Sequence, residues 1–307
     1  DPITQQTALA SAGAAGAGGD PVYVDDVFST WTYDGTGSAE TITNGIDLLN
    51  EGGLVWRKNR NDTTGQSHFL HDTERSPQSG MPTAHRLSIN NDSKQYSDND
   101  YITSWNSNGF TYSTGNSALS GSGEEVVSWT FRKTPGFFDV VTYNGDSDPS
   151  TTIAHNLGST PGMIIIKRTG TTDGGNWVVH HRSLGFTHYL ILNSDASKYS
   201  IGSRISAANA STFTPGSDSD TNQTGHTYVA YLFAHDDQSF GANSDESIIK
   251  CDSYVGAGTG NVKEVNLGFE PQWLLIKKTD GTENWMIFDS MRGVHAAGGS
   301  DDHFLMQ

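Results

Sequence analysis

The sequence has little of several things that would place it in a familiar class: one cysteine, few basic residues and no long apolar run. Cys251 alone cannot form an internal disulfide, so no disulfide framework supports the fold. The 18 Lys and Arg residues face 35 Asp and Glu residues, for a net charge of −17. A nucleic-acid-binding protein needs a basic surface, so nucleic acid is excluded as the main partner.

Apolar runs such as 163–166 and 273–276 are far shorter than the roughly 20 residues of a membrane-spanning helix. We therefore expect no membrane insertion. The first basic residue is Arg57, and residues 9–19 are mostly Ala and Gly, which is not the pattern of a signal peptide. Residues 1–21 are interpreted as a flexible Ala/Gly-rich leader or docking arm, at an end where the initial Asp1 indicates processing or truncation.

What the sequence does have is polar turn-forming residues and a repeat. Charged residues make up 17% of the chain, whereas Gly, Ser, Thr and Asn are abundant, which is typical of short strands and many turns. The motif containing Tyr33 recurs around Tyr143 and Tyr254, at a spacing of about 110 residues. The lysines that follow these motifs, Lys58, Lys167 and Lys277, keep nearly the same spacing.

The repeat predicts an all-β protein of tandem antiparallel β-sandwich units of about 110 residues each. Unit 1 spans 22–134, unit 2 spans 135–245, and unit 3 spans 246–307. Short linkers at the unit boundaries would leave the units as separate beads in a row. Unit 3 contains only the N-terminal half of the pattern, so we expect the chain to be part of a longer polypeptide, or a partner to supply the remaining strands.

Two strands of the repeat have a clear pattern, residues 127–131 and 229–233. Valine and aromatic residues alternate there with other residues, which predicts strands with one buried and one solvated face. The pairs Asp72 with Arg75 and Asp289 with Arg292 share the same three-residue spacing in their units.

The residues do not point to an enzyme. Adjacent carboxylates such as Glu124–Glu125 and Asp236–Asp237 point to opposite faces of a strand and cannot act together on one glycosidic bond. No Gly-x-Ser-x-Gly motif is present, and Cys251 lies in an alternating strand as a small buried residue.

No resident cofactor is expected, and calcium is the one ion for which the sequence offers a weak site. Asp218, Asp220 and Asn222 form an acidic Asp-x-Asp-x-Asn loop, but the Gly and Glu that an EF-hand loop requires are replaced by Gln223 and Val229. His180 and His181 are neighbours that a strand would point apart, so they do not predict a transition-metal site.

Tryptophans could stack on sugars, but most of them recur at the same position of the repeat, which favours packing in the core. Trp105, between Ser104 and Asn106, is the least constrained of them and is the candidate ligand-binding residue. The seven tryptophans are Trp31, Trp56, Trp105, Trp129, Trp177, Trp273 and Trp285.

Several long strings resemble a recurrent domain of marine bacteriophage virion proteins, in particular tail fibre and tailspike-like components. They are residues 24–30 (VDDVFST), 41–48 (TITNGIDL), 127–133 (VSWTFRK), 135–141 (PGFFDVV) and 227–237 (TYVAYLFAHDD). The resemblance covers essentially residues 22–307 and brings no catalytic residues. It implies a structural role in the virion together with binding of a host surface receptor.

The sequence therefore predicts a non-enzymatic tail fibre or tail-associated protein of the virion, extracellular when assembled. Other tail or capsid proteins and a host surface glycan are the expected partners, and a homotrimer is the expected oligomer, because small units gain buried apolar area by association. The alternatives are a secreted carbohydrate-binding or polysaccharide-degrading protein, and a capsid decoration or neck protein. Fold alone does not choose among these functions.

Overall fold

The computed structural model describes residues 20–61, 66–76, 84–98, 102–113, 117–170, 174–200, 204–293 and 303–306. The predicted leader lies almost wholly outside these residues. The chain is nearly all β, with several antiparallel sheets, which confirms the predicted fold class. Within the described ranges, no helix has the length and hydropathy needed to cross a bilayer.

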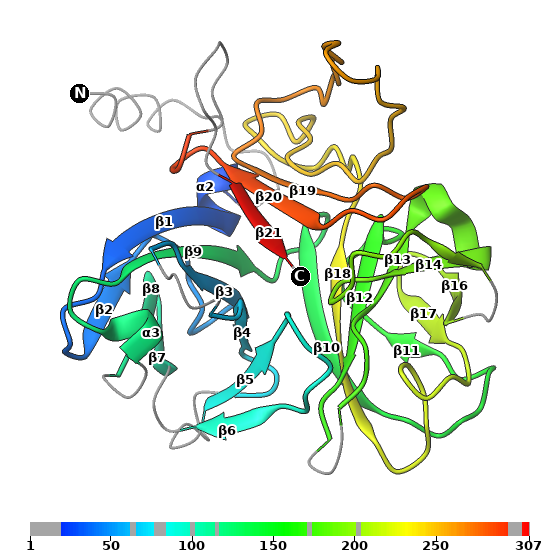
Figure 1. Cartoon of the computed structure of the whole chain (residues 1–307), viewed down its shortest axis with the longest axis horizontal. Helices are drawn as coiled ribbons and strands as arrows, with labels where there is room; N and C mark the ends of the chain where they lie inside the picture. The colour runs from blue at the N-terminus through cyan, green and yellow to red at the C-terminus, as the bar shows by residue number, and fades with distance from the viewer. Residues whose placement is uncertain are drawn as a thin grey trace.

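Unit 1 contains a six-stranded sheet and a three-stranded sheet (Figure 1). The six-stranded sheet has the order β1 (Phe28–Asp34), β9 (Glu125–Arg132), β3 (Gly53–Asn59), β4 (Phe69–Asp72), β5 (Ala84–Ser88) and β6 (Tyr96–Asp98). The smaller sheet has the order β2 (Glu40–Thr43), β8 (Gly109–Tyr112) and β7 (Ile102–Asn106).

Unit 2 has the same arrangement of strands. Its six-stranded sheet has the order β10 (Phe138–Asn144), β18 (Thr227–Phe233), β12 (Met163–Arg168), β13 (Val178–His181), β14 (His188–Ile191) and β15 (Tyr199–Ser200). Its smaller sheet consists of β11 (Ile153–Ala154), β17 (Thr212–Pro215) and β16 (Ile205–Ala208).

Unit 3 contributes one three-stranded sheet, β19 (Trp273–Ile276), β20 (Trp285–Asp289) and β21 (His303–Met306). By sequence position these strands correspond to β3, β4 and β5 of unit 1. The helical elements of the described residues are short: α2 (Val24–Val27), α3 (Ser117–Ser120) and the 3-10 helix η2 (Arg182–Thr187).

The central strands are buried on both faces, and the prediction of half-buried strands is wrong. In β18, Val229, Tyr231 and Phe233 face one apolar core, whereas Ala230 and Leu232 face another. The second core lies against the small sheet of the same unit, so each large sheet is covered on its outer face by the small sheet and on its inner face by its neighbours. Period-2 alternation therefore separates two buried faces here rather than a buried face from a wet one.

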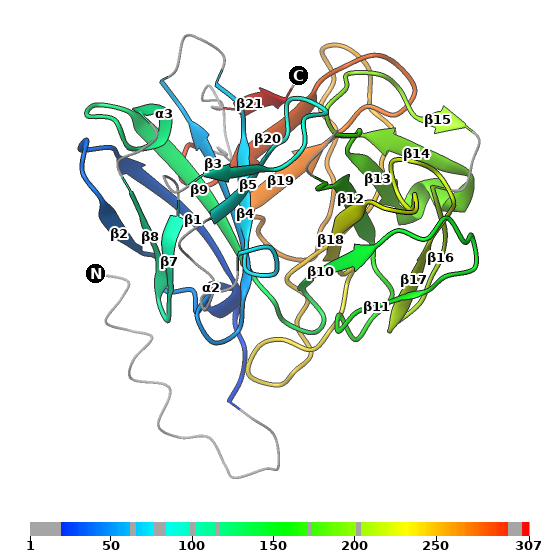
Figure 2. The same ribbon diagram turned by 90° about the horizontal axis from the view of Figure 1, so that it is seen from below.

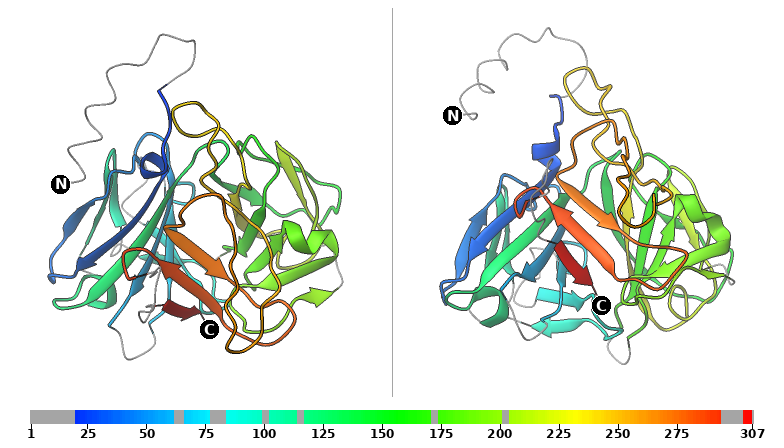
Figure 3. Two further views of the ribbon diagram at one scale, coloured as in Figure 1. Left: turned by 90° about the horizontal axis from the view of Figure 1, so that it is seen from above. Right: turned by 45° about the horizontal axis from the view of Figure 1, so that its top comes forward.

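The inner faces of the two six-stranded sheets and one face of the sheet β19–β21 share one apolar core. Trp56 of unit 1, Tyr231 of unit 2 and Trp285 of unit 3 all belong to it. The sheet β19–β21 lies across the junction of the other two, as both views in Figure 3 show (orange and red). The expectation of separate beads in a row is therefore wrong, because the large sheets would expose wide apolar faces if the units stood apart. Figure 2 shows the same packing from below.

One glycine is required where the small sheet of unit 1 forms. Gly109 has a φ of +147° and pairs with Thr43 across β2 and β8. A Cβ atom at this position would lie 1.9 Å from the carbonyl oxygen of Ile42. Any side chain would push β8 away from β2 and loosen the cover over the outer face of β3.

Candidate functional site

The junction of units 1 and 2 is held by a buried ion pair and a tyrosine. Arg75 Nε donates to Asp72 Oδ2 at 2.7 Å, and the Arg75 backbone N–H donates to Asp72 Oδ1 at 2.9 Å. The hydroxyl of Tyr231, from unit 2, donates to the same Asp72 Oδ2 at 2.8 Å. Burial raises the pKa of Tyr231 well above its usual value, so the hydroxyl keeps its proton and remains a donor.

The same arrangement joins units 3 and 1. Arg292 Nε donates to Asp289 Oδ2 at 2.5 Å, and the indole Nε1 of Trp129, from unit 1, donates to that oxygen at 3.2 Å. The Arg292 guanidinium also lies 5.5 Å from the centre of the Trp129 ring. Trp129 and Tyr231 are at equivalent positions of β9 and β18, so an aromatic donor from one unit meets an Asp–Arg pair of the next at both junctions.

Tryptophan and lysine side chains add contacts between units in the same sense. Trp177 Nε1 of unit 2 donates to the carbonyl of Ser88 in unit 1 at 3.1 Å. Trp285 Nε1 of unit 3 donates to the carbonyl of Ile191 in unit 2 at 3.0 Å. Lys167 Nζ donates to the Asp92 carbonyl at 3.0 Å, and burial lowers the pKa of this lysine to about 8. If the units separated, each of these donors would lose the acceptor that the neighbouring unit supplies, and Lys167 would keep only the carbonyl of Gly175 in its own unit.

Trp105, the candidate ligand-binding residue, lies in the interior. Its side chain is 2% exposed, and its Nε1 donates to the carbonyl of Ser76 at 2.7 Å. It packs in the core between β3 and the small sheet of unit 1. The prediction that its ring is available to a ligand is wrong, because strand alternation places Ser104 and Asn106 on the other face and turns the indole inward.

The three calcium candidates already have partners. Asp218 and Asp220 both form ion pairs with Arg204, and Asp220 also accepts hydrogen bonds from the backbone and side chain of Asn176 at 3.2 and 3.3 Å. Asn222 donates to Asp146 Oδ1 at 3.1 Å. Within the described residues, no three His, Cys, Asp or Glu side chains gather as a metal site. The Arg204 guanidinium already supplies positive charge to the loop, so less net negative charge remains to bind a cation.

The two carboxylates of Glu124–Glu125 contact different residues, and His180 packs against an aromatic ring. Glu124 accepts a short hydrogen bond from Asn59 Nδ2, whereas Glu125 forms a 3.1 Å ion pair with Arg60. The His180 ring stacks on Phe186, with ring centres 4.6 Å apart. Burial is the main reason that the pKa of His180 is lowered to about 4, so the ring is neutral near pH 7.

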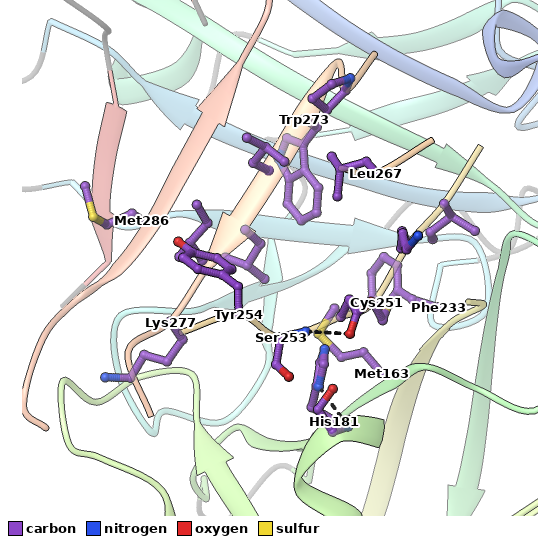
Figure 4. A pocket seen from close by; sticks show the side chains of 18 of the residues that line it. Met163, His181, Phe233, Cys251, Ser253, Tyr254, Leu267, Trp273, Lys277 and Met286 are labelled. Atoms are coloured by element: carbon purple, nitrogen blue, oxygen red, sulfur yellow. Dashed lines mark hydrogen bonds between the residues drawn. The ribbon is translucent and has the colours of Figure 1, made fainter. Parts of the chain in front are cut away.

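A cleft of about 1260 Å³ lies between β19, the segment 249–258 and the inner face of unit 2. Figure 4 shows Trp273, Tyr254 and Leu267 on one side of it, and Met163, Phe233 and His181 on the other. Most of the lining is apolar, which favours a ligand with apolar side chains over a sugar.

Two of the titratable side chains that line this cleft, Cys251 and His181, are poorly suited to catalysis. Burial raises the pKa of the Cys251 thiol to about 12, so the sulfur is not a thiolate at neutral pH. Burial also lowers the pKa of His181 to about 4, well below the range that general-base catalysis at pH 7 favours. No single motif predicts this cleft; its signal in the sequence is that residues 246–307 carry only the first half of the repeat pattern.

Comparison with known proteins gives one result. No curated protein and no solved structure matches the chain. The model of a family described as a domain of unknown function, DUF7483, matches residues 24–301, which is most of the chain and includes the described parts of the cleft and both unit junctions. The chain therefore belongs to the DUF7483 family.

Proposed function

We propose that this chain is a non-enzymatic structural component of a bacteriophage virion, placed in the tail or at the virion surface. The observation that carries the proposal is the single apolar core shared by three sheets and closed by hydrogen bonds between units. A virion appendage works outside the cell and needs a rigid shape, and here buried aromatic and ionic contacts provide rigidity without disulfides. The resemblance to marine phage tail proteins supports the same role.

Host attachment belongs to the proposal as a second step. Loops at the outer edges of the small sheets are polar and are the surface offered to a host glycan. Trp105 takes no part in such contact because it is buried. We expect a homotrimer, although much of the apolar burial that favours association already occurs inside one chain. Sedimentation velocity distinguishes a trimer from a monomer.

Immunogold electron microscopy of phage particles, with an antibody raised against this chain, tests the location. We expect label on the tail, whereas label on the capsid or neck would support a decoration or neck protein. A glycan array with the purified chain tests attachment separately. Release of reducing sugar from host polysaccharide by the purified chain would refute the proposal and support the alternative of a polysaccharide-degrading protein.

A further inference from the structure

In each of the two six-stranded sheets, a strand occupies the place that corresponds to the cleft beside β19. In unit 1, β9 lies between β1 and β3 and pairs with both; in unit 2, β18 lies between β10 and β12 in the same way. By sequence position, β19 corresponds to β3 and β12, and the segment 249–255 corresponds to β10. β19 pairs with β20 along one edge, and among the described residues no strand pairs with its other edge.

Equivalent side chains of units 2 and 3 differ in solvent exposure, as expected if no strand lies beside the outer edge of β19. Tyr143 is 9% exposed, but its counterpart Tyr254 is 49% exposed. All six residues of β12 are buried, whereas the four residues of β19 are each only half-buried. The strand that shields these positions in unit 2 is β18, so the difference marks the place of one strand.

Unit 2 has the surface that would receive an aromatic residue of such a strand, and we call this surface the socket. At the two described junctions, an aromatic residue of β9 or β18 meets an Asp–Arg pair of the adjacent unit. The corresponding positions of unit 2 carry His181 and Leu184, and both line the cleft. This socket lacks the Asp–Arg charge pair, so it fits an aromatic ring that needs no carboxylate partner.

Polar groups at the cleft also point to a polypeptide ligand. The indole Nε1 of Trp273 is buried and has no hydrogen-bond partner among the described residues. The outer edge of β19 offers backbone N–H and C=O groups, which an added strand would satisfy. A buried donor without an acceptor is unfavourable, so an occupant with backbone carbonyls is favoured over a purely apolar one.

We propose that the cleft binds one extended polypeptide segment, which adds a β-strand antiparallel to β19 and has the sequence pattern of β9 and β18. The strand has apolar residues at alternating positions and an aromatic residue facing His181 and Leu184. Main-chain hydrogen bonds to β19 give affinity, and the aromatic residue fixes the register. This inference stands independently of the virion role.

A labelled peptide with the sequence of residues 226–235 (HTYVAYLFAH), titrated into the full chain, tests the proposal by fluorescence anisotropy. We expect a Kd of about 10 µM or lower, and binding at least about tenfold weaker to the Leu275→Arg variant. Leu49→Arg, on an exposed position of unit 1, is the matched control and should bind as the unchanged chain does. A scrambled peptide and one with Pro in place of Ala230 should not bind, because Pro removes a ladder donor.

A second measurement keeps the proposal testable if the free peptide aggregates or the Leu275→Arg variant does not fold. The same ten residues are joined to the C-terminal end through a Gly/Ser linker of about 35 residues, which is long enough to reach the cleft. We expect slower amide exchange at 273–276 and 249–255 and a higher Tm than with a scrambled tether. Equal behaviour of native and scrambled sequences in both measurements would overturn the proposal. So would a dimer in which a second copy fills the cleft and excludes the peptide.

Discussion

Removal of the Tyr231 hydroxyl tests the junction between units 1 and 2. In Tyr231→Phe the ring keeps its place in the core, and Asp72 keeps its ion pair with Arg75 at 2.6 Å. What is lost is the hydrogen bond to a buried carboxylate, worth about 1.5–3 kcal/mol, together with a long one of 3.4 Å that the hydroxyl accepts from Arg75. For a chain of this length, a loss of about 2 kcal/mol lowers the Tm by about 3 °C if the chain unfolds in one transition.

Urea and thermal unfolding of the variant measure this loss, and two controls set its scale. Tyr143→Phe removes a hydroxyl that donates to a neutral carbonyl inside unit 2, at 2.6 Å from Thr221 O, and should cost only about 1 kcal/mol. Tyr199→Phe changes an exposed ring and should leave the free energy of unfolding within about 0.5 kcal/mol of the original.

The reasoning would be refuted by two results. One is a Tyr231→Phe variant no less stable than Tyr199→Phe, because the buried hydroxyl would then contribute nothing to the junction. The other is a separate early transition for one unit, because units that share a single core should unfold together.

Three further predictions concern single positions. The pKa of Lys167 is about 8 in the folded chain and near 10.5 in the unfolded one, so the unfolded state binds more protons between these values. Across pH 8 to 10.5, the free energy of unfolding measured in urea should rise more in the original chain than in Lys167→Met; equal slopes would contradict this. His180, with a folded pKa of about 4, should make stability fall as the pH drops from 6.5 toward 4, and His180→Gln should flatten that fall in thermal melts. Gly109→Ala should lower the free energy of unfolding by more than about 2 kcal/mol because of the clash with Ile42. In the control Gly123→Ala, nothing lies within 4 Å of the added atom, and the positive φ alone should cost about 1 kcal/mol. Similar losses for the two variants in chemical denaturation would count against the close approach at Gly109.

The fold class followed from the sequence because turn residues and strand periodicity are local signals. The burial of both faces of β18 had a local signal too, since residues 228–234 contain no charged or strongly polar side chain apart from the tyrosine hydroxyls. Alternation of large and small apolar residues was instead interpreted as alternation of buried and exposed ones.

Other features depend on contacts that no local pattern contains. The spacing of Asp72 and Arg75 is visible in the sequence, but Tyr231, which completes their hydrogen bonding, lies 159 residues away from Asp72. The polar neighbours of Trp105 suggested exposure, although in a strand they indicate the opposite side for the indole. The cleft depends on the packing of units 2 and 3, so its lining could not be derived from single motifs.

The contacts between units run in one rotational direction. Unit 2 gives its aromatic donor to unit 1, and unit 1 gives its own to unit 3. Unit 3 closes the ring, because the indole of Trp285 donates to the carbonyl of Ile191 in unit 2. In a solenoid, by contrast, each repeat contacts only its neighbours in the sequence. Units 1 and 3 are therefore neighbours in space although unit 2 separates them in the sequence, so removal of any one unit would expose a buried face on each of the other two.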